Sequence, residues 1–319
     1  MEIPLQFGAY AARARELLNT RAARAALKAL RVAVPVLLLA YLSYRLTQIG
    51  WSQVWNSRPV SPAFYVILLL QILTVPVGET IIYGRLWNGG KRLSLLVFLR
   101  KQYLNIVLDY SGEAYLYFWA KRTLKLPNNT LLHAIKDTNV LSAGASLIMV
   151  WLMFLALVTM GGLNLSAVLS HYAWIAAFAV TVPLVLSLAL IVGGQRVSIL
   201  SRAQMASTFC IQLARSFVDL SSEFGLWWFS GALPSVGVCL QFVALQMLVT
   251  RLPFIPGKGL LFAGAGIAAA GLIKVPAPPV AAVLVIRPAF HLLVALVLVG
   301  IPWLFDRTLF QQEADQAVV

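Results

Sequence analysis

Residues 251–271 read RLPFIPGKGLLFAGAGIAAAG, a stretch that is nearly free of charge yet holds five glycines and two prolines. Pro253, Pro256, Gly257 and Gly259 lie within seven residues, and such a cluster disfavours a continuous helix. In hydrocarbon, non-helical backbone persists only where it is buried in protein or lines a wet cavity. The stretch therefore predicts a broken segment inside a membrane protein.

The break in this stretch has two interpretations. A helix that begins there presents free N–H groups and a positive dipole end, which together form a site for an anionic group. Candidate binding residues are Pro256, Gly257, Lys258 and Gly259. Alternatively, the break is a tight hairpin, and its small residues allow neighbouring helices to approach closely. The GKG triplet is not a nucleotide-binding loop, because Gly259 stands where that motif requires serine or threonine.

The composition of the whole chain is that of a membrane protein. Its 319 residues are 60% hydrophobic and only 11% charged, with a mean hydropathy of +0.83, whereas soluble domains average about 25% charged residues. The net charge of +14 fits an excess of cytoplasmic Lys and Arg, and we expect no nucleic-acid partner. Two cysteines and three scattered histidines predict no metal site, and no cofactor is expected.

We expect an all-α polytopic protein with about six full spans and two broken or re-entrant segments. About 20 apolar residues are needed to cross the hydrocarbon core. The predicted spans are roughly 30–49, 62–86, 138–161, 171–193, 226–250 and 279–304, and the interrupted segments are 98–120 and 252–275. Residues 1–29 form a basic amphipathic arm, 30–306 a single membrane domain, and 307–319 a short polar tail. The first apolar run follows the arm without a small-residue cleavage site, which predicts a retained anchor.

The distribution of Lys and Arg predicts the topology. The basic arm and the loops after the second and fourth spans are rich in these residues, so both termini are expected on the cytoplasmic side. Each half of the domain, 30–161 and 171–306, then holds three spans with a broken segment between its second and third. An odd number of spans turns the second half upside down. Inverted repeats with broken segments are a transporter architecture.

The first broken segment reads FLRKQYLNIVLDYSGEAYLYFWA. Its polar residues Lys101, Asn105, Asp109 and Glu113 fall four apart, which places them on one stripe of a helix. Ser111 and Gly112 interrupt that helix close to Glu113. Either the segment is an interfacial helix with a solvated face, or its polar residues line a site.

Ionisable residues within the predicted spans indicate a functional site more strongly than the polar stripe does. Each is energetically disfavoured inside the membrane and by default marks a site. Arg287 lies deep in the last span, His291 follows one turn later, and Glu79 sits just after Pro76 and Gly78. One interpretation pairs Glu79 with Arg287 in a structural ion pair. The other has both residues line a site for a polar lipid head group. A further stripe, Arg215–Asp219–Glu223, predicts an interfacial helix with internal ion pairs.

These features resemble the transmembrane domain of the lysylphosphatidylglycerol synthase family of flippase-like proteins. The stretch LNIVLDYSGEAYLYFWAKR is similar to the family's early Gly-Glu motif through Gly112 and Glu113. PFIPGKGLLFAG is similar to its later Pro-Gly turn, and AAVLVIRPAF to its closing helix with Arg287. The resemblance implies the handling of phospholipid, aminoacylated, isoprenoid-linked or hopanoid-like lipids at a bacterial inner membrane. The soluble aminoacyltransferase domain of the full synthases is not expected here.

We therefore expect a flippase-like lipid translocase of the bacterial inner membrane. Its lipid would be polar-headed, either anionic or of the isoprenoid or hopanoid type, with its head bound near Lys101, Glu113, Lys258 and Arg287. Its partners would be membrane lipids and proteins of lipid or envelope synthesis. Two alternatives stay open, a membrane-embedded head-group enzyme and a scaffold subunit of a synthesis complex. We do not expect an enzyme, because no nucleophile–base set or paired-carboxylate metal site is visible.

Overall fold

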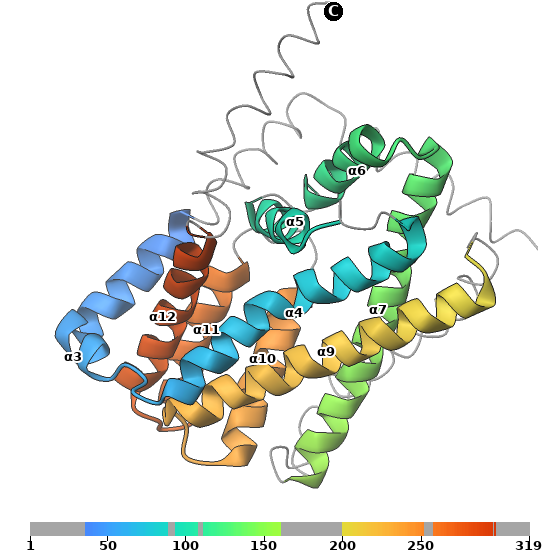
Figure 1. Cartoon of the computed structure of the whole chain (residues 1–319). Helices are drawn as coiled ribbons and strands as arrows, with labels where there is room; N and C mark the ends of the chain where they lie inside the picture. Colours follow the sequence, from blue (N-terminus) through green and yellow to red (C-terminus); the bar gives the residue numbers. More distant parts are fainter. Residues whose placement is uncertain are drawn as a thin grey trace, which may run out of the picture. The chain divides into compact units, whose positions relative to one another are not determined.

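The computed structural model describes residues 36–88, 93–107, 111–160, 200–251, 258–295 and 297, and throughout these ranges the regular structure is helical (Figure 1). The helices are the segment Val36–Ile49, α3 (Trp51–Asn56), α4 (Pro62–Trp87), α5 (Leu95–Val107), α6 (Ser111–Leu124), α7 (Asn128–Thr159), α9 (Arg202–Ser230), α10 (Val236–Arg251), α11 (Lys258–Leu272) and α12 (Ala277–Ala295). The predicted all-α class is confirmed for this part of the chain. The arm, the 171–193 span and the polar tail lie outside it.

Three of these helices are long and apolar enough to cross a membrane: α4, α7 and residues Ala277–Val294 of α12. They correspond to the predicted spans at 62–86, 138–161 and 279–304. Helix α7 begins earlier than predicted, at Asn128, directly after Pro127, which occupies its N-cap and has no N–H to donate within a helix. Val36–Ile49 is a shorter apolar helix.

The predicted span at 226–250 is interrupted. Helix α9 ends at Ser230 with Gly231 in the left-handed conformation (φ 66°), and α10 begins only at Val236. The Ser230 hydroxyl accepts a hydrogen bond from the Ala232 amide at 3.1 Å, which closes the turn. Glycine just past a helix end, followed by a proline such as Pro234, is a helix stop. The sequence analysis did not predict this break, because the residues on both sides of it are apolar.

The chain divides into two compact units. The first contains the described residues up to Ser57 together with Leu245–Ala282, and the second contains Arg58–Ala244 and the residues from Val283 onward. In the first unit, Gly264 of α11 packs against the Tyr41 ring, which a Cβ at that glycine would approach to 3.2 Å. The predicted halves, 30–161 and 171–306, and their inverted relation stay predictions.

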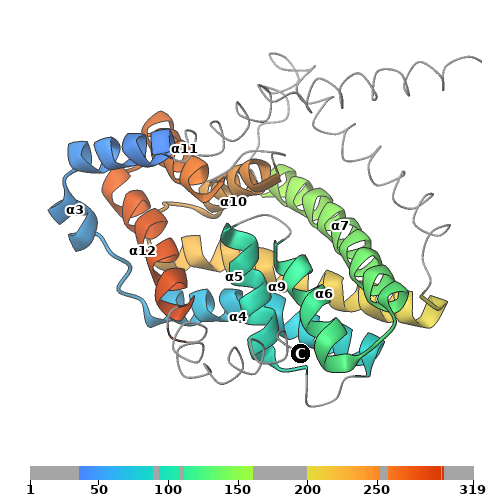
Figure 2. The same ribbon diagram turned by 90° about the horizontal axis from the view of Figure 1, so that it is seen from above.

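Helices α4 and α9 lie side by side in the second unit and run antiparallel (Figures 1 and 2). Ile67 packs against Gly225, Gln71 is bonded to Glu223, and Gly78 lies under the Arg215 side chain. Residue numbers thus rise along α4 as they fall along α9. Glycines at two of these three contacts let the helices approach closely.

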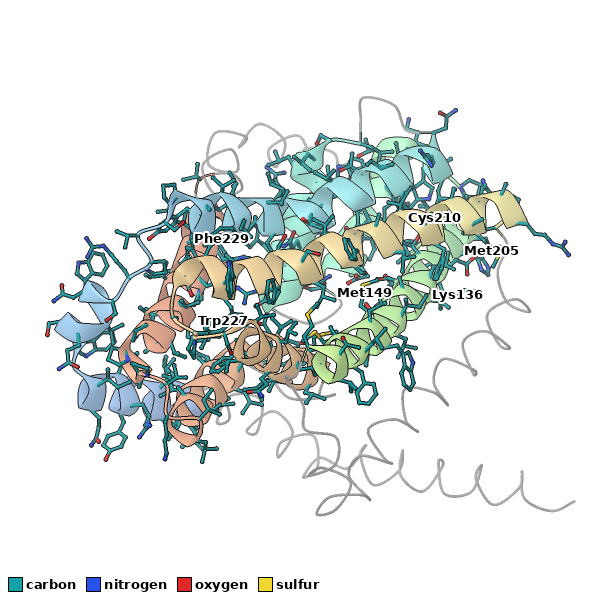
Figure 3. The ribbon with its side chains drawn as sticks, turned by 90° about the horizontal axis from the view of Figure 1, so that it is seen from below. Lys136, Met149, Met205, Cys210, Trp227 and Phe229 are labelled. Carbon is teal, nitrogen blue, oxygen red and sulfur yellow. The ribbon has the colours of Figure 1, made fainter. Side chains whose placement is uncertain are left out.

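The last turns of α9 carry one aromatic side chain that is buried, Trp227, and one that is exposed, Phe229 (Figure 3). Trp227 is buried, and its ring lies 4.8 Å from that of Phe242 on α10. Phe229 is exposed. A second set of buried aromatic residues joins α4 to α5, where the rings of Tyr83 and Phe98 stack 5.6 Å apart. The second unit therefore holds two buried aromatic contacts, one between α9 and α10 and one between α4 and α5.

Helices α5 and α6 form a tight hairpin, which confirms the interruption predicted within 98–120. In one continuous helix, residues 101 and 112 would be about 16 Å apart along the axis. Instead, a Cβ at Gly112 would overlap the carbonyl oxygen of Lys101. The Gly112 amide donates to Asn105 Oδ1 at 2.7 Å, and the Ser111 hydroxyl donates to the Leu104 carbonyl at 2.7 Å. The chain therefore reverses direction between the two helices.

This hairpin predicts the effect of adding one methyl group. Gly112→Ala should lower stability by about 1–3 kcal/mol, because the new Cβ forces the two helices apart. Gly84→Ala on α4 is the matched control, since a Cβ there meets nothing within 4 Å and should stabilise the helix by up to about 1 kcal/mol. Thermal unfolding of the two variants in detergent measures the difference. Equal melting temperatures would contradict the hairpin geometry.

A buried polar belt as the candidate functional site

Two clusters of polar side chains are buried among the helices of the second unit, and we call them together the polar belt. The Arg287 cluster consists of Gln71, Glu223 and Arg287; the Lys101 cluster consists of Glu79, Lys101, Asn105 and Glu113. Helix α4 joins the two clusters, because Gln71 and Glu79 lie on one stripe, about 12 Å apart along its axis. Charged residues are rarely buried unless they are paired.

The Arg287 cluster is a closed network that ties α12 to α9 and α4. Arg287 Nη1 and Nη2 donate to the two carboxylate oxygens of Glu223 at 2.6 and 2.5 Å. Nη2 also donates to Gln71 Oε1 at 3.1 Å, and Gln71 Nε2 donates to Glu223 Oε2 at 2.7 Å. A bidentate, charge-assisted pair of this kind is among the strongest hydrogen-bonding arrangements in proteins.

The predicted pairing of Glu79 with Arg287 is wrong, because Arg287 binds Glu223 while Glu79 binds Lys101. The antiparallel register of α4 and α9 explains this, since it brings Glu223 to Gln71 and leaves Glu79 two turns further along α4. The ion pairs predicted within the α9 stripe are also not formed by Arg215 and Glu223, the residues at its two ends. Glu223 pairs with Arg287, and Arg215 Nη2 donates to Ser142 Oγ on α7 at 2.8 Å.

Sequence reasoning missed Gln71, although a signal for it existed. It is a polar residue within the apolar run VILLLQILTV of a predicted span, and a buried polar group in such a place requires a hydrogen-bonding partner. A search for partners across helices would have had to include Glu223.

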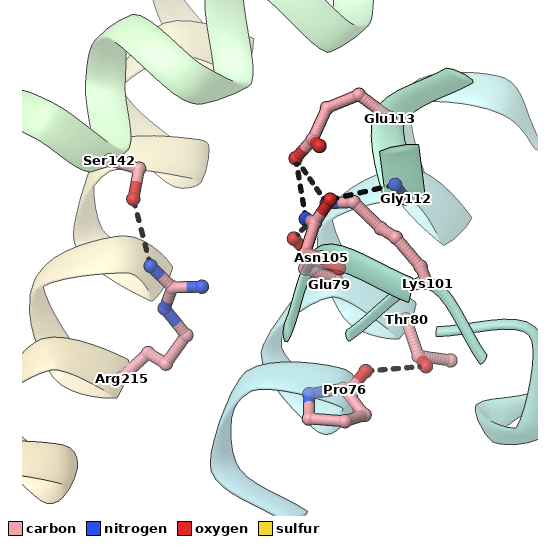
Figure 4. A network of polar contacts seen from close by, with 9 residues as sticks. All are labelled: Pro76, Glu79, Thr80, Lys101, Asn105, Gly112, Glu113, Ser142 and Arg215. Carbon is pink, nitrogen blue, oxygen red and sulfur yellow. Dashed lines mark hydrogen bonds and ion pairs between the residues drawn. The ribbon is translucent and has the colours of Figure 1, made fainter. Parts of the chain in front are cut away.

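The Lys101 cluster brings together three helices (Figure 4). The Lys101 side chain is only 3% exposed, and its ammonium forms an ion pair with Glu79 Oε1 and lies 3.4 Å from Glu113 Oε1. Asn105 Nδ2 donates to the same Glu113 oxygen at 3.2 Å. Glu79 Oε2 and Glu113 Oε2 are buried without a hydrogen-bond partner. Of the predicted stripe, Lys101, Asn105 and Glu113 do converge, but the hairpin rather than one helix face unites them.

The remaining predicted site residues are placed as follows. Asp109, Pro256 and Gly257 lie outside the described residues. His291 is half-buried on α12, where its backbone carbonyl accepts a hydrogen bond from the Tyr103 hydroxyl at 3.2 Å. Lys258 and Gly259 open α11 in the first unit. Their predicted convergence with Arg287 stays a prediction.

An apolar groove of about 360 Å³ runs between α4 and α9. Its walls include aliphatic side chains of α4 and aromatic side chains of α9: Ile67, Leu70, Phe217, Phe224, Trp228 and Phe229. Leu70 and Ser222 line the groove, and their chain neighbours Gln71 and Glu223 belong to the Arg287 cluster. The groove thus runs alongside a charged network. No sequence pattern indicated it, because it depends on how two helices pack.

The fold and the belt define a helical protein with apolar helices long enough to cross a membrane and charged networks buried between them. Over the described part of the chain, no group of three or more His, Cys, Asp or Glu residues could hold a metal ion. Comparisons with models of protein families, with curated proteins and with solved structures find no match. The resemblance to the lysylphosphatidylglycerol synthase family stays a prediction.

The Arg287 cluster predicts a specific pattern of stabilities. Arg287→Gln should cost about 3–5 kcal/mol, because it leaves the Glu223 carboxylate buried without its cation. Adding Glu223→Gln should restore much of that loss, since the double variant buries no charge there. Arg202→Gln, at an exposed position on the same helix as Glu223, should stay within about 0.5 kcal/mol of the wild type. Denaturant unfolding in detergent provides all four values. A double variant no more stable than Arg287→Gln would contradict the pairing.

Proposed function

We propose that this chain is a multi-pass protein of a bacterial cytoplasmic membrane that binds polar-headed lipids and moves their head groups across the bilayer. The observation that carries the proposal is the apolar groove running beside the buried Arg287 cluster. A lipid needs both environments at once, an apolar surface for its acyl chain and a polar site for its head. The two are joined here by adjacent residues of α4 and of α9.

The buried charges support a functional role for the belt. Insertion of Lys, Arg or Asp at the centre of a membrane helix costs about 2.5–3.5 kcal/mol per residue. Both α4 and α12, which carry Glu79 and Arg287, are long and apolar enough to span. A buried ion pair is weak evidence of added stability, because apolar residues of similar size often serve as well. Retention of such charges within apolar helices is characteristic of substrate and ion pathways.

The Arg287 cluster has the chemistry to receive an anionic head group. A guanidinium binds a phosphate through the same two parallel hydrogen bonds that it makes to a carboxylate. In our proposal the lipid phosphate replaces the Glu223 carboxylate on Arg287. Gln71 donates to Glu223 and would keep one oxygen of the displaced carboxylate bonded. The exchange would release α12 from α9, and that release would open the site toward the other leaflet.

The groove supplies the place for an acyl chain. Phe217, Trp228 and Phe229 on its α9 wall are exposed, as is Leu70 on the α4 wall. A concave site with mostly apolar walls is typical of ligand binding. With the acyl chain in the groove, the lipid head would lie beside Gln71 and Glu223.

Filling the groove tests the proposal without disturbing the ionic network. Ser221 lines the groove and is exposed, so Ser221→Trp should exclude part of the acyl chain. Losing contact with about two methylene groups, each worth about 0.8 kcal/mol, should lower transport roughly tenfold. The measurement is dithionite quenching of a fluorescent phosphatidylglycerol in liposomes containing the purified protein.

The matched control is Ala206→Trp, an exposed position on the same helix about 22 Å away along the axis. It should transport like the wild type. The proposal is contradicted if wild-type liposomes quench no faster than protein-free vesicles, or if the two tryptophan variants behave alike.

A further inference from the structure

The Lys101 cluster carries more negative than positive charge. It holds two carboxylates, Glu79 and Glu113, and one ammonium, Lys101, which leaves a net charge of −1. The Glu79 side chain is 8% exposed, and its Oε2 atom is buried without a hydrogen-bond partner; Glu113 Oε2 is in the same state. Each carboxylate meets Lys101 through one oxygen and leaves the other oxygen without a partner, and burying a charge is costly unless it is both paired and hydrogen-bonded. The cluster is therefore short of one positive charge and one hydrogen-bond donor.

The charged and titratable groups on the surrounding helices have contacts of their own. On α9, Arg215 donates to Ser142. On α5, Arg100 interacts with the Tyr115 hydroxyl; Tyr115 is two residues from Glu113 and so about 200° around α6. On α7, Asp137 pairs with Lys136. On α4, the centre of the Tyr83 ring lies 6.0 Å from Lys101 Nζ, and the Tyr83 hydroxyl interacts with the Thr138 side chain on α7.

A metal ion is a poor fit for the missing charge. Hard cations take six or more oxygen ligands, and the described residues contain no group of three or more acidic, His or Cys side chains that could hold a metal ion. The Lys101 ammonium already lies against one oxygen of each carboxylate, where a shared metal would have to bind. A proton meets both needs, because it supplies one charge and turns one carboxylate oxygen into a donor.

We propose that Glu79 and Glu113 together form a proton-binding site, in which the two carboxyl groups hold one proton between them beside the Lys101 ammonium. Proton uptake brings the cluster from −1 to neutral, and proton release returns it to −1. The proton weakens the attraction of the carboxyl groups for Lys101. Because Glu79 belongs to α4 while Lys101 and Glu113 belong to the α5–α6 hairpin, proton uptake alters the contact between the hairpin and α4. A role for this proton in driving transport rests on the proposed function; the site itself does not.

Carbodiimide modification tests the site directly. N,N′-dicyclohexylcarbodiimide reacts with protonated carboxyl groups in apolar surroundings and leaves a stable acylurea, which peptide mass spectrometry locates. With the full chain in detergent, we expect a single adduct on Glu79 or Glu113, lost as the buffer is made alkaline. The double variant Glu79→Gln/Glu113→Gln should lose the adduct. Glu223, whose two oxygens both bind Arg287, is the internal control and should stay unmodified.

A second variant separates a proton site from mere reactivity. Lys101→Gln removes the only cation of the cluster, so the labelling should persist to higher pH than in the wild type. Lys101→Arg keeps the charge and should leave the pH profile near that of the wild type. If Lys101→Gln does not fold, the wild-type profile and the Lys101→Arg profile still decide.

The proposal is overturned by three results: no adduct at any pH, labelling of Glu223 to the same extent, or labelling of Glu79 and Glu113 that is independent of pH. These results are separate from the liposome experiment, which measures lipid movement. Lipid transport without pH-dependent labelling would overturn the proton site alone. Labelling without lipid transport would overturn the proposed function alone.

Discussion

The paired hydrogen bonds between Arg287 and Glu223 are the interaction on which the second unit depends. They join α12 to α9 in an interior where few polar groups are available, and Gln71 bonds both members from α4. In low dielectric such a network is strong when every member is satisfied and costly when one is missing. The register of three helices is thereby fixed at one point, and the positions of the other belt residues follow from that register.

The groove and the belt are two results of the same helix pairing. Along α4, one side of the stripe that meets α9 carries Ile67 and Leu70, and the adjoining side carries Gln71. Along α9, Ser222 lines the groove and Glu223 belongs to the Arg287 cluster. A helix pair that places apolar and ionic surfaces in adjacent positions is suited to an amphiphile, and neither helix alone would form such a site.

Much of the fold and part of the site followed from the sequence. Hydropathy located α4, α7 and α12. The rule that buried charges are unusual singled out Glu79 and Arg287, and the four-residue spacing of polar residues singled out Lys101 and Glu113. Partner assignment failed, because periodicity defines the face of a helix but not its register against another helix. Glu223 was assigned to ion pairs within an interfacial helix, because Arg215 and Asp219 lie on the same stripe. The turn at Gly231 was overlooked for a different reason, as an average over 20 residues conceals a break of only a few.

The missing side chain at Gly112 has a mechanical consequence. The first turn of α6 rests directly on the backbone of α5 at Lys101, and the Asn105 amide group holds it there. Glu113 and Lys101 therefore belong to one rigid helical hairpin, α5–α6. The distance between these two residues changes little when the hairpin moves as a unit. A movement of the hairpin relative to α4 would then change mainly the contact between Lys101 and Glu79. A change of charge at that contact would strengthen or weaken the attachment of the hairpin to α4.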